Sequence, residues 1–337
     1  MNIKNTRLWK FAKEAKNKRI KKKRYKDALK MLLNQYEDYL VERSYEMMQR
    51  KAYFASHAYR INFDNPSTFT EKRQWLKLYD QDPRKTIYTD KYEVRKHIKE
   101  VLGEDYLIPL ISIDGKDCFD SVKEIDFDKL PNSFVIKCTH GSHMNIIVKD
   151  KSKLSKKDFK NYKKQLNEWL HTNYAYVVAL ELQYKDIQPR LIIEQFVDFE
   201  GSSLTDYKFF CFSGDVKFVG IFENRWSDEY KETYLDNSFR PLKFRLDPYD
   251  SNPSIEKPSR FDEMVKIAKK LCEGFLMVRV DLYEANGKVF FGELTFSSAA
   301  GYDFPNPYEY DRILGDYIQI DPNKRKGNYK YRKHENN

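Results

Sequence analysis

The sequence predicts an α+β fold, in which antiparallel sheets are backed by helices. Two pairs of apolar segments flank short turn sequences, Ser213-Gly214-Asp215 and Asn286-Gly287, and such pairs are typical of β-hairpins. Other stretches carry apolar residues at three- and four-residue spacing, as amphipathic helices do. This mix of hairpins and helices indicates the α+β class.

The elements follow in order along the chain. The turn at Asn65-Pro66-Ser67 offers an N-cap to the helix after it, Thr89 or Asp90 can cap the next helix, and Gly103 is suited to end that helix. The predicted helices are 28–60, 68–79, 90–102, 154–171 and 261–272. The predicted strands are 107–113, 134–138, 146–149, 191–197, 207–212, 216–222, 277–283 and 288–294.

The composition is that of a folded protein. The 337 residues are 41% hydrophobic and 15% aromatic, and disordered chains are poor in aromatic residues. The four cysteines are widely spaced and form no C-x-x-C pair, which fits a reducing compartment. No apolar run approaches the roughly 20 residues of a membrane span, and the basic N-terminus lacks the apolar stretch of a secretory signal. We therefore expect a cytoplasmic protein.

The positive charge is concentrated at one end. The chain carries a net charge of +10, yet residues 1–30 alone hold thirteen Lys and Arg against two acidic residues. Apolar residues at helical spacing among these charges predict that residues 1–25 bind an anionic membrane surface peripherally. A solvated basic helix is the plainer alternative, and nucleic acid is a weaker one.

Charged residues interrupt two apolar strands near the end of the chain. The segments 278–283 and 290–295 carry Arg279, Asp281 and Glu293 among apolar neighbours. Burying such charges costs several kcal/mol each unless they are paired or bind a cation. Two carboxylates that converge on one point suit a hard cation, and Mg²⁺ with ATP phosphates is a common occupant. A surface hairpin with solvated charges is the alternative.

The register of this hairpin tests the metal hypothesis. If Asn286-Gly287 forms a two-residue loop, Asp281 pairs with Gly292 and Glu293 points to the opposite face. A three-residue loop, or one β-bulge, brings Asp281 and Glu293 to the same face. The metal hypothesis therefore predicts something other than the tightest regular hairpin.

A lysine ends the predicted strand over 134–138. Lys137 is followed by a loop that includes Gly141 and Ser142, and such a loop can offer backbone N–H groups to a phosphate. An inert strand and loop is one alternative. The other is a zinc site formed by Cys138, His140 and His143.

A further apolar strand, 191–197, precedes Asp206 and Lys208. Its edge could receive a purine, with Asp206 on ribose hydroxyls and Lys208 reaching a phosphate. The alternative is a structural salt bridge between Glu194 and Lys208 on neighbouring strands.

Taken in order, these segments resemble the ATP-grasp superfamily, and more narrowly its TupA-like branch, which is associated with teichuronopeptide and capsular polysaccharide synthesis. The resemblance runs from about Asn62 to Leu314. It is carried by Thr68-Phe69-Thr70-Glu71-Lys72, Trp75-Leu76-Lys77-Leu78-Tyr79, Asp90-Lys91-Tyr92 with Arg95, 134–149, 206–212 and 278–295.

The resemblance implies two α+β lobes whose antiparallel sheets clasp ATP, with a helical N-terminal segment. The implied regions are a basic N-terminal part (1–60), an N-terminal and central lobe (61–190), a C-terminal lobe (191–320) and a basic flexible tail (321–337). The implied catalytic residues are Arg279, Lys137 and Lys208. The implied nucleotide-binding residues are Lys137, His140, Gly141, Ser142, Glu194, Gln195, Phe196, Val197, Asp206 and Lys208. The implied ligands of Mg²⁺, expected as two ions, are Asp281, Glu293 and Thr295.

The chain departs from the family pattern in two places. It has Gly141-Ser142-His143-Met144 where the branch usually carries Gly-Ser-Gly-Gly, and Thr295 where Asn is frequent. Altered specificity, weaker metal binding or loss of activity would follow from such changes.

The resemblance implies an ATP- and Mg²⁺-dependent carboxylate–amine ligase that works through an acyl phosphate. The expected substrates are a uronic-acid-containing surface glycan or precursor and an amine such as an amino acid. The alternatives are a sugar kinase on the same scaffold, a glycosyltransferase of capsule synthesis, and a membrane-docked scaffold without activity.

Overall fold

The computed structural model describes residues 45–178, 180–197, 205–224, 227–246 and 249–321. The chain divides into two compact units, residues 1–60 with 328–337 and residues 61–327. In the first unit, the described part of the predicted helix over 28–60 is confirmed as α3 (Tyr45–His57). The basic segment 1–25 lies outside the described residues, so its membrane role stays a prediction.

Helix α4 (Phe69–Tyr79) begins at a capping box in the second unit. The Thr68 hydroxyl accepts a hydrogen bond from the Glu71 backbone N–H at 3.3 Å, and the Glu71 carboxylate accepts one from the Thr68 N–H. Every residue from Phe69 to Leu78 except Lys72 is buried, so α4 lies inside the unit. Asp311 of α9 (Glu309–Gly315) accepts two hydrogen bonds from Thr70, both 2.9 Å. Helices α4 and α9 are thereby joined.

The helix predicted over 90–102 is present as α6 (Val94–Val101), which begins four residues late, and a separate helix, α5 (Arg84–Thr89), precedes it. The reason is local: Asp90 Oδ1 accepts from the N–H groups of Tyr92 and Glu93, which closes a turn between the helices. Gly103, at φ +106°, ends the segment as predicted.

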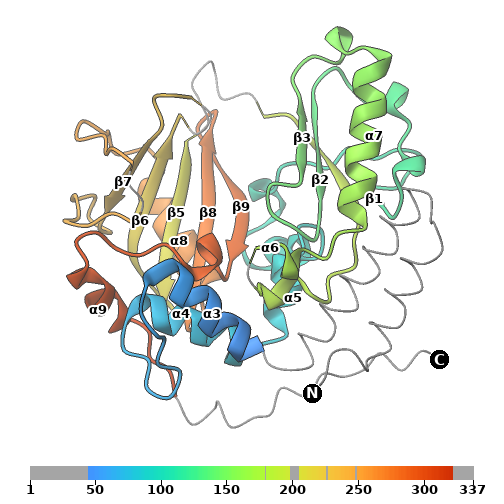
Figure 1. Cartoon of the computed structure of the whole chain (residues 1–337). Helices are drawn as coiled ribbons and strands as arrows, with labels where there is room; N and C mark the ends of the chain where they lie inside the picture. Colours follow the sequence, from blue (N-terminus) through green and yellow to red (C-terminus); the bar gives the residue numbers. More distant parts are fainter. Residues whose placement is uncertain (1–44, 179, 198–204, 225–226, 247–248, 322–337) are drawn as a thin grey trace, which may run out of the picture. The chain divides into compact units, whose positions relative to one another are not determined.

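The first sheet has four antiparallel strands in the order β1-β4-β2-β3. They are β1 (Cys118–Phe119), β4 (Leu191–Gln195), β2 (Phe134–Cys138) and β3 (Asn145–Val148). Helix α7 (Lys156–Leu170) packs beside this sheet and buries Leu166 in its core (Figure 1). The strand predicted over 107–113 is wrong: only isolated bridges form there, between Leu110 and Glu194 and between Ile113 and Lys116. Pro109 lacks an N–H group and cannot donate to a ladder, although its carbonyl accepts from Gln195.

The second sheet has five antiparallel strands in the order β7-β6-β5-β8-β9. They are β7 (Lys231–Leu235), β6 (Asp215–Glu223), β5 (Asp206–Phe212), β8 (Met277–Ala285) and β9 (Lys288–Thr295). Both predicted hairpins are present, and Asn286 and Gly287 adopt φ +53° and +68°, as the tightest right-twisted turn requires. Strand β7, which the sequence analysis missed, carries Lys231, Glu232 and Thr233 among its five residues.

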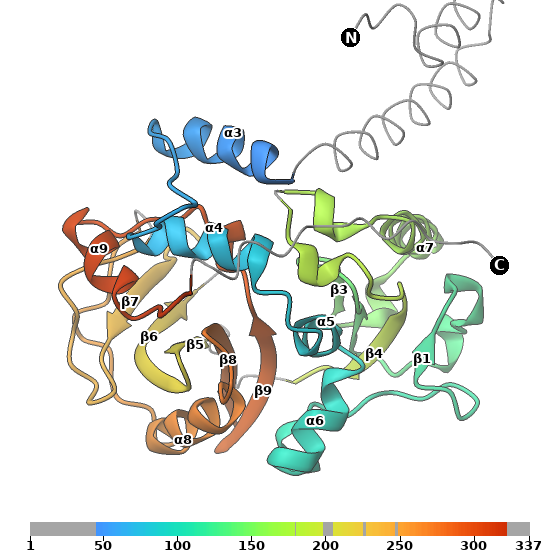
Figure 2. The same cartoon turned by 90° about the horizontal axis from the view of Figure 1, so that it is seen from below.

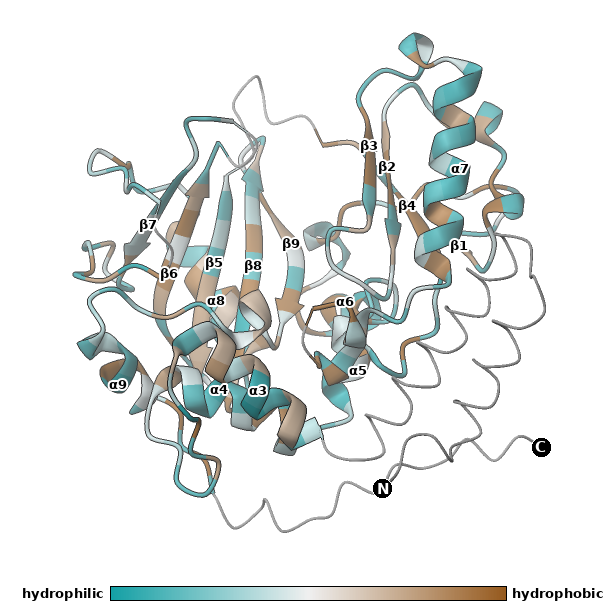
Figure 3. Ribbon diagram, in the orientation of Figure 1, coloured by the Kyte–Doolittle hydropathy of each residue, from teal (hydrophilic) through white to brown (hydrophobic). Residues whose placement is uncertain are grey.

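Helix α8 (Phe261–Leu271) covers one face of the five-stranded sheet, as both views show (Figures 1 and 2). Its buried residues pack with the apolar side chains of β5, β6, β8 and β9 in one core. Hydrophobic residues run along the strands of both sheets, whereas α7 is largely hydrophilic (Figure 3). Lys208 and Asp281 alternate along their strands with apolar residues of this core and therefore stand on the face away from α8.

Short 3₁₀ turns complete the fold at Glu104–Tyr106, Val122–Glu124, Phe127–Lys129, Lys151–Lys153, Tyr174–Tyr176, Leu182–Tyr184 and Ser298–Gly301. The predicted α+β class with antiparallel sheets and helices is confirmed. No helix among the described residues is long and apolar enough to cross a lipid bilayer.

Candidate active site

A β-bulge sets the register of the β8–β9 hairpin. Ala285 pairs with Lys288 across a two-residue loop, so the longer loop considered above is wrong. The register then shifts between Asp281 and Leu282, and Asp281 lies directly opposite Glu293. The bulge alternative is thus confirmed, and the two carboxylates share one face of the sheet.

Gly292 is the extra residue of this bulge. A Cβ atom at this position would lie 2.9 Å from the Asp281 carbonyl oxygen and 2.8 Å from the Tyr283 ring. The first of these neighbours is backbone and cannot rotate away. Gly292→Ala is therefore expected to lower the free energy of unfolding by about 1–3 kcal/mol. Chemical denaturation measures this effect, and an unchanged free energy of unfolding would contradict a special role of the bulge.

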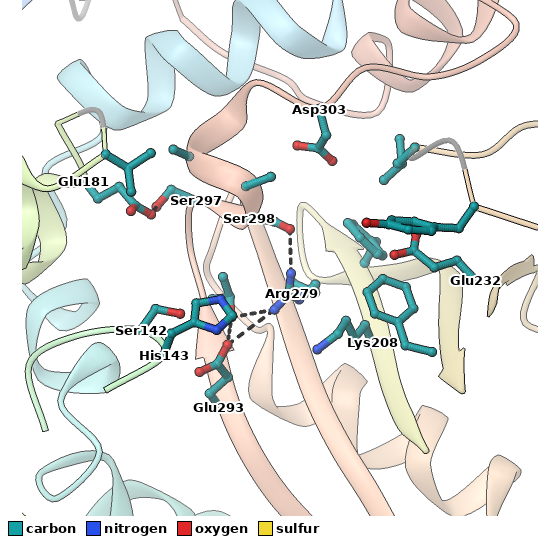
Figure 4. A pocket seen from close by; sticks show the side chains of 18 of the residues that line it. Ser142, His143, Glu181, Lys208, Glu232, Arg279, Glu293, Ser297, Ser298 and Asp303 are labelled. Atoms are coloured by element: carbon teal, nitrogen blue, oxygen red, sulfur yellow. Dashed lines mark hydrogen bonds and ion pairs between the residues drawn. The ribbon is translucent and has the colours of Figure 1, made fainter. Parts of the chain in front are cut away.

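Arg279 is the centre of the charged cluster (Figure 4). Its Nε and Nη2 atoms donate to the two carboxylate oxygens of Asp281 at 2.6 and 2.7 Å. Nη2 also contacts Glu293 Oε1 at 3.3 Å and Thr295 Oγ1 at 3.2 Å, and Nη1 donates to Ser298 Oγ at 2.5 Å. The guanidinium thus aligns both predicted metal carboxylates.

Lys208 joins the same cluster from β5. Its Nζ lies 2.7 Å from Asp281 Oδ2 and 3.4 Å from Asp206 Oδ2, and all three side chains are at most 3% exposed. The alternative of a Glu194–Lys208 salt bridge is wrong, because the two residues belong to different sheets. Glu194 instead lies 2.5 Å from Lys137 Nζ. The two predicted phosphate lysines thus come from separate sheets.

Lys91 is a cation that the predicted set of site residues missed. Its backbone N–H donates to the Thr139 carbonyl and its Nζ donates to the Gly141 carbonyl at 2.6 Å, so it is tied to the predicted phosphate loop. Burial lowers the pKa of Lys91, while the Glu293 carboxylate opposes that effect. Its place in Asp90-Lys91-Tyr92 was visible in the sequence, but no strand or loop pattern marked it as part of the site.

Glu293 is held ionised by its surroundings. Burial by itself would raise the pKa of its carboxyl, but the positive charges of Lys91, Arg279 and Lys208 lower the pKa to about 2. The Thr295 hydroxyl, which donates to Glu293 Oε1 at 2.7 Å, acts in the same direction. A carboxylate in this state is ready to bind a cation at any physiological pH.

The loop after β2 presents only part of its predicted set to the site. Ser142 and His143 line a cavity beside the cluster, whereas His140 Nε2 lies 3.0 Å from the Trp169 carbonyl. The zinc alternative finds no support, because the described part of the chain has no group of three His, Cys, Asp or Glu residues able to hold a metal. A Cβ at Gly141 would lie 2.5 Å from Met144 Sδ, so a larger residue there would displace the Met144 side chain.

The cavity beside the charged cluster has a volume of about 520 Å³. Lys208, Arg279, Glu293 and Thr295 line it, and Figure 4 shows the first three close to one another. The rest of its wall is mainly aromatic, acidic or formed by the loop after β9. These residues are Tyr174, Val178, Glu181, Tyr184, Phe210, Phe222, Tyr230, Glu232, Tyr234, Leu246, Tyr249, 297–300 and Asp303.

A second cavity, of about 650 Å³, lies at the connection between the sheets. Gln195, Phe196 and Val197 line it together with Phe290 of β9. Leu107, Pro109 and Leu110 add apolar surface to its wall. Three of the residues predicted to receive adenine therefore border one partly apolar cavity.

Helix α4 holds the loop that follows β9. Lys77 Nζ donates to the Ala300 carbonyl at 2.7 Å, Gln74 Nε2 donates to the Gly301 carbonyl at 2.7 Å, and Arg73 lies 2.7 Å from Asp303. Ala299, Ala300 and Gly301 all have positive φ, a conformation that needs such support. The motif around α4 thus serves the cavity indirectly, by fixing one of its walls.

The donor set fits Mg²⁺. Magnesium is usually held by one or two carboxylates together with substrate phosphates and water, and not by a full set of protein ligands. Asp281 and Glu293 supply two carboxylates from opposite positions of one hairpin. Thr295 is hydrogen-bonded to Glu293 and stands where it can support that ligand.

Comparisons with known proteins found a family model and several solved structures that are similar to this chain. The model of the TupA-like ATP-grasp family matches residues 71–319. Among solved structures, a D-alanine–D-alanine ligase from Bacillus anthracis complexed with ATP is 15% identical, with a TM-score of 0.41, over 69% of this chain and 65% of that chain. The corresponding ligase from Helicobacter pylori is 16% identical, with a TM-score of 0.42, over 75% and 70% of the two chains.

An L-amino acid ligase from Bacillus licheniformis is 11% identical, with a TM-score of 0.40, over 74% of this chain and 53% of that chain. The chain thus spans less than two thirds of the length of the first and last of these structures. No curated protein matches the sequence. The family model covers most of the chain, and its match confirms the predicted fold family and the assignment as an ATP-grasp enzyme. The chain belongs to the TupA-like ATP-grasp family.

Proposed function

We propose that the protein is an ATP- and Mg²⁺-dependent carboxylate–amine ligase that activates its carboxylate substrate as an acyl phosphate. The observation that carries the proposal is the cluster of Arg279, Lys208, Asp281 and Glu293, in which every member except the buried Asp281 lines one cavity. Such a cluster supplies charge neutralisation and positioning without a protein nucleophile, which is what transfer of a phosphoryl group to a carboxylate requires.

The nucleotide would lie between the two sheets. The adenine would occupy the cavity bordered by Gln195, Phe196 and Val197, and Asp206 would receive the ribose hydroxyls. Lys137 and Lys208 would bind the phosphates, and Lys91, which is tied to the Gly141 carbonyl, is placed to do the same. In the structure Lys137 and Lys208 each contact a carboxylate, and Lys91 contacts a carbonyl oxygen. The phosphates of the nucleotide would replace these partners.

The chemistry then has two steps. A carboxylate oxygen of the substrate attacks the γ-phosphorus, the bond to the β-phosphate oxygen breaks, and ADP leaves. The amine nitrogen attacks the acyl carbon, the carbon–oxygen bond breaks, inorganic phosphate leaves and the nitrogen loses a proton. Arg279 would stabilise the negative charge that develops on the acyl oxygen.

Mg²⁺, held by Asp281, Glu293 and Thr295, would neutralise the phosphate oxygens and align the γ-phosphate. Two ions fit the proposal, because two carboxylates and the phosphates together offer enough oxygen ligands. We propose that the carboxylate belongs to a uronic-acid-containing surface glycan or its precursor, and that the amine is an amino acid or a related molecule. The aromatic wall of the cavity supports a sugar ring there, since pyranose faces pack on aromatic rings.

Hydroxylamine trapping tests the proposal. When the protein is incubated with ATP, Mg²⁺, a uronic acid and hydroxylamine, we expect ADP to be released and a hydroxamate to form. The hydroxamate forms because hydroxylamine reacts with the acyl phosphate. A phosphorylated sugar without hydroxamate would instead identify a sugar kinase. ADP formation with neither product would contradict both activities.

Lys137→Ala is expected to weaken binding of an ATP analogue by at least about tenfold, because a charge-assisted hydrogen bond to phosphate contributes about 1.5–3 kcal/mol. Calorimetry with the analogue and Mg²⁺ measures this, and Lys129→Ala, which removes an exposed lysine of the same lobe, is the control. Unchanged affinity in Lys137→Ala would remove this residue from the site.

We also propose peripheral attachment to the cytoplasmic face of an anionic membrane through residues 1–25, on the basis of the charge and apolar spacing in that segment. Deletion of residues 1–25 is expected to release the protein from vesicles that contain anionic lipid at low salt. Sedimentation with these vesicles, compared with neutral vesicles, measures the effect. A truncated protein that still sediments with anionic vesicles would place the attachment elsewhere.

A further inference from the structure

One end of the 520 Å³ cavity holds a buried carboxylate that the proposed reaction does not use. Glu232 of β7 lines the cavity and is 3% exposed. Its Oε2 accepts a hydrogen bond from the Tyr234 hydroxyl at 2.9 Å, and its Oε1 accepts one from the Tyr230 hydroxyl. Among the described residues, no Lys, Arg or His side chain forms an ion pair with Glu232. A buried carboxylate satisfied only by neutral donors is costly, and a cation would offset that cost.

Aromatic rings surround this carboxylate. The Phe222 ring lies 6.3 Å from the Tyr230 ring and 6.2 Å from the Tyr234 ring, and Tyr249 packs 4.5 Å from Tyr230. All four rings line the cavity with Glu232. An acid within a cage of aromatic faces is the arrangement that proteins use to bind ammonium groups.

The cage already contacts one ammonium group. Lys208 Nζ lies 5.1 Å from the centroid of the Phe222 ring, within the range of a cation–π interaction. Phe222 pairs with Asp206 of β5 on one side and with Glu232 of β7 on the other. Phe222 therefore lies between Glu232 and Lys208, the lysine that is proposed to bind a phosphate. The charges near Arg279 are thus paired with one another, whereas Glu232 has no cationic partner among the described residues at the other end of the same face (Figure 4).

The distance between the two ends constrains the ligand. Strands β7 and β8 are separated by three strand spacings, about 14 Å between backbones. An amino group held by Glu232 is therefore separate from a nitrogen that attacks an acyl carbon beside Arg279. The ligand must carry a second functional group in addition to the reacting amine.

We propose that Glu232, Phe222, Tyr230, Tyr234 and Tyr249 bind an ammonium group of the amine substrate, other than the nitrogen that reacts. The substrate class is accordingly a diamine or an amino acid with a basic side chain. The identification of this molecule as a substrate rests on the proposed ligase function, whereas cation binding at the cage does not.

Ligand-observed NMR titration of the full chain with n-pentylammonium tests the proposal, with 1-pentanol and pentanoate as uncharged and anionic probes of the same length. Pentylammonium is expected to bind at least about tenfold more tightly than either probe. Glu232→Gln is expected to remove that preference, while Glu223→Gln, a carboxylate-to-amide change in the adjacent strand away from the cavity, should preserve it. Equal binding of the three probes to the wild type, or an unchanged preference in Glu232→Gln, would overturn the proposal.

A second variant covers the case in which Glu232→Gln does not fold. Tyr249 is 45% exposed, so Tyr249→Leu removes one ring of the cage with little loss of buried surface. It is expected to weaken pentylammonium binding about threefold, and unchanged binding would count against the cage. ADP affinity, measured in the same samples, is expected to stay within about twofold in both variants. Absence of nucleotide binding in the wild type would contradict the proposed function. The preference for pentylammonium would still show whether the cage binds an ammonium group.

Discussion

Glu293→Gln is expected to lower the rate of ADP release by at least about 100-fold. The substitution keeps the shape of the side chain but removes the charge that lies opposite Asp281 and within reach of Arg279, Lys91 and Lys208. Without that charge the site loses a proposed metal ligand and gains net positive charge. A coupled assay for ADP at saturating Mg²⁺ and ATP measures the effect, and Asp281→Asn is expected to behave in the same way.

Two measurements separate this effect from general damage. Glu284→Gln makes the same chemical change in the same hairpin and should retain ADP release. The Glu284 carboxylate accepts a hydrogen bond from the Ser259 hydroxyl and is not part of the cluster. Circular dichroism should show that Glu293→Gln is folded at the assay temperature. Full turnover in both Glu293→Gln and Asp281→Asn would end the metal assignment.

The lowered pKa of Glu293 also determines the pH range in which this carboxyl stabilises the folded state. The carboxyl has a folded-state pKa of about 2, below its ordinary value near 4.5, so its contribution is present above pH 4.5. That contribution is lost as the pH falls from about 4.5 through 2. Urea unfolding of Glu293→Gln should therefore lack the part of the pH dependence that the wild type shows in this window.

Arg279→Met is expected to lower the free energy of unfolding by about 3–5 kcal/mol. The guanidinium makes two hydrogen bonds to Asp281, which is 1% exposed, and removing it leaves Asp281 with Lys208 as its main partner. Breaking one side of a buried ion pair is destabilising because the remaining charge is no longer compensated. Urea denaturation at pH 7 measures the loss.

Two further variants identify what Arg279 contributes. Arg279→Lys keeps the charge but cannot reproduce the two parallel bonds to Asp281, so it should recover part of the stability and little of the activity. Arg240→Met removes an exposed arginine from a surface pair with Asp236 and should change the free energy of unfolding by less than about 1 kcal/mol. Similar losses in Arg279→Met and Arg240→Met would show that Arg279 is not structurally special.

Local signals in the sequence predicted much of the fold. The two hairpins, α4 and α7 were each marked by turn residues, capping residues or helical spacing, although the N-cap of α4 is Thr68 and not a residue of the predicted turn 65–67. The strand over 107–113 was wrong because Pro109 interrupts the ladder, and β7 was missed because charged residues hide its pattern. Whether a segment forms a strand depends on which neighbouring strand it pairs with. The spacing of apolar residues along the sequence does not contain that information.

The site could be predicted only in part for the same reason. The sequence indicated that Asp281 and Glu293 would meet if a bulge were present, but the position of the bulge follows from packing around Gly292. Lys91 and Glu232 reach the site through contacts between distant segments, so no spacing rule identifies them. The structure also pairs Lys137 with Glu194, which the sequence analysis had considered as a partner of Lys208.

A crystal structure with an ATP analogue and Mn²⁺ in place of Mg²⁺ tests the central claim most directly, because the anomalous signal of manganese locates the metal directly. We expect a manganese peak bound by carboxylate oxygens of both Asp281 and Glu293, with the analogue's phosphates on the same ion and beside Lys208. Nucleotide bound with its metal away from these two carboxylates would contradict the account.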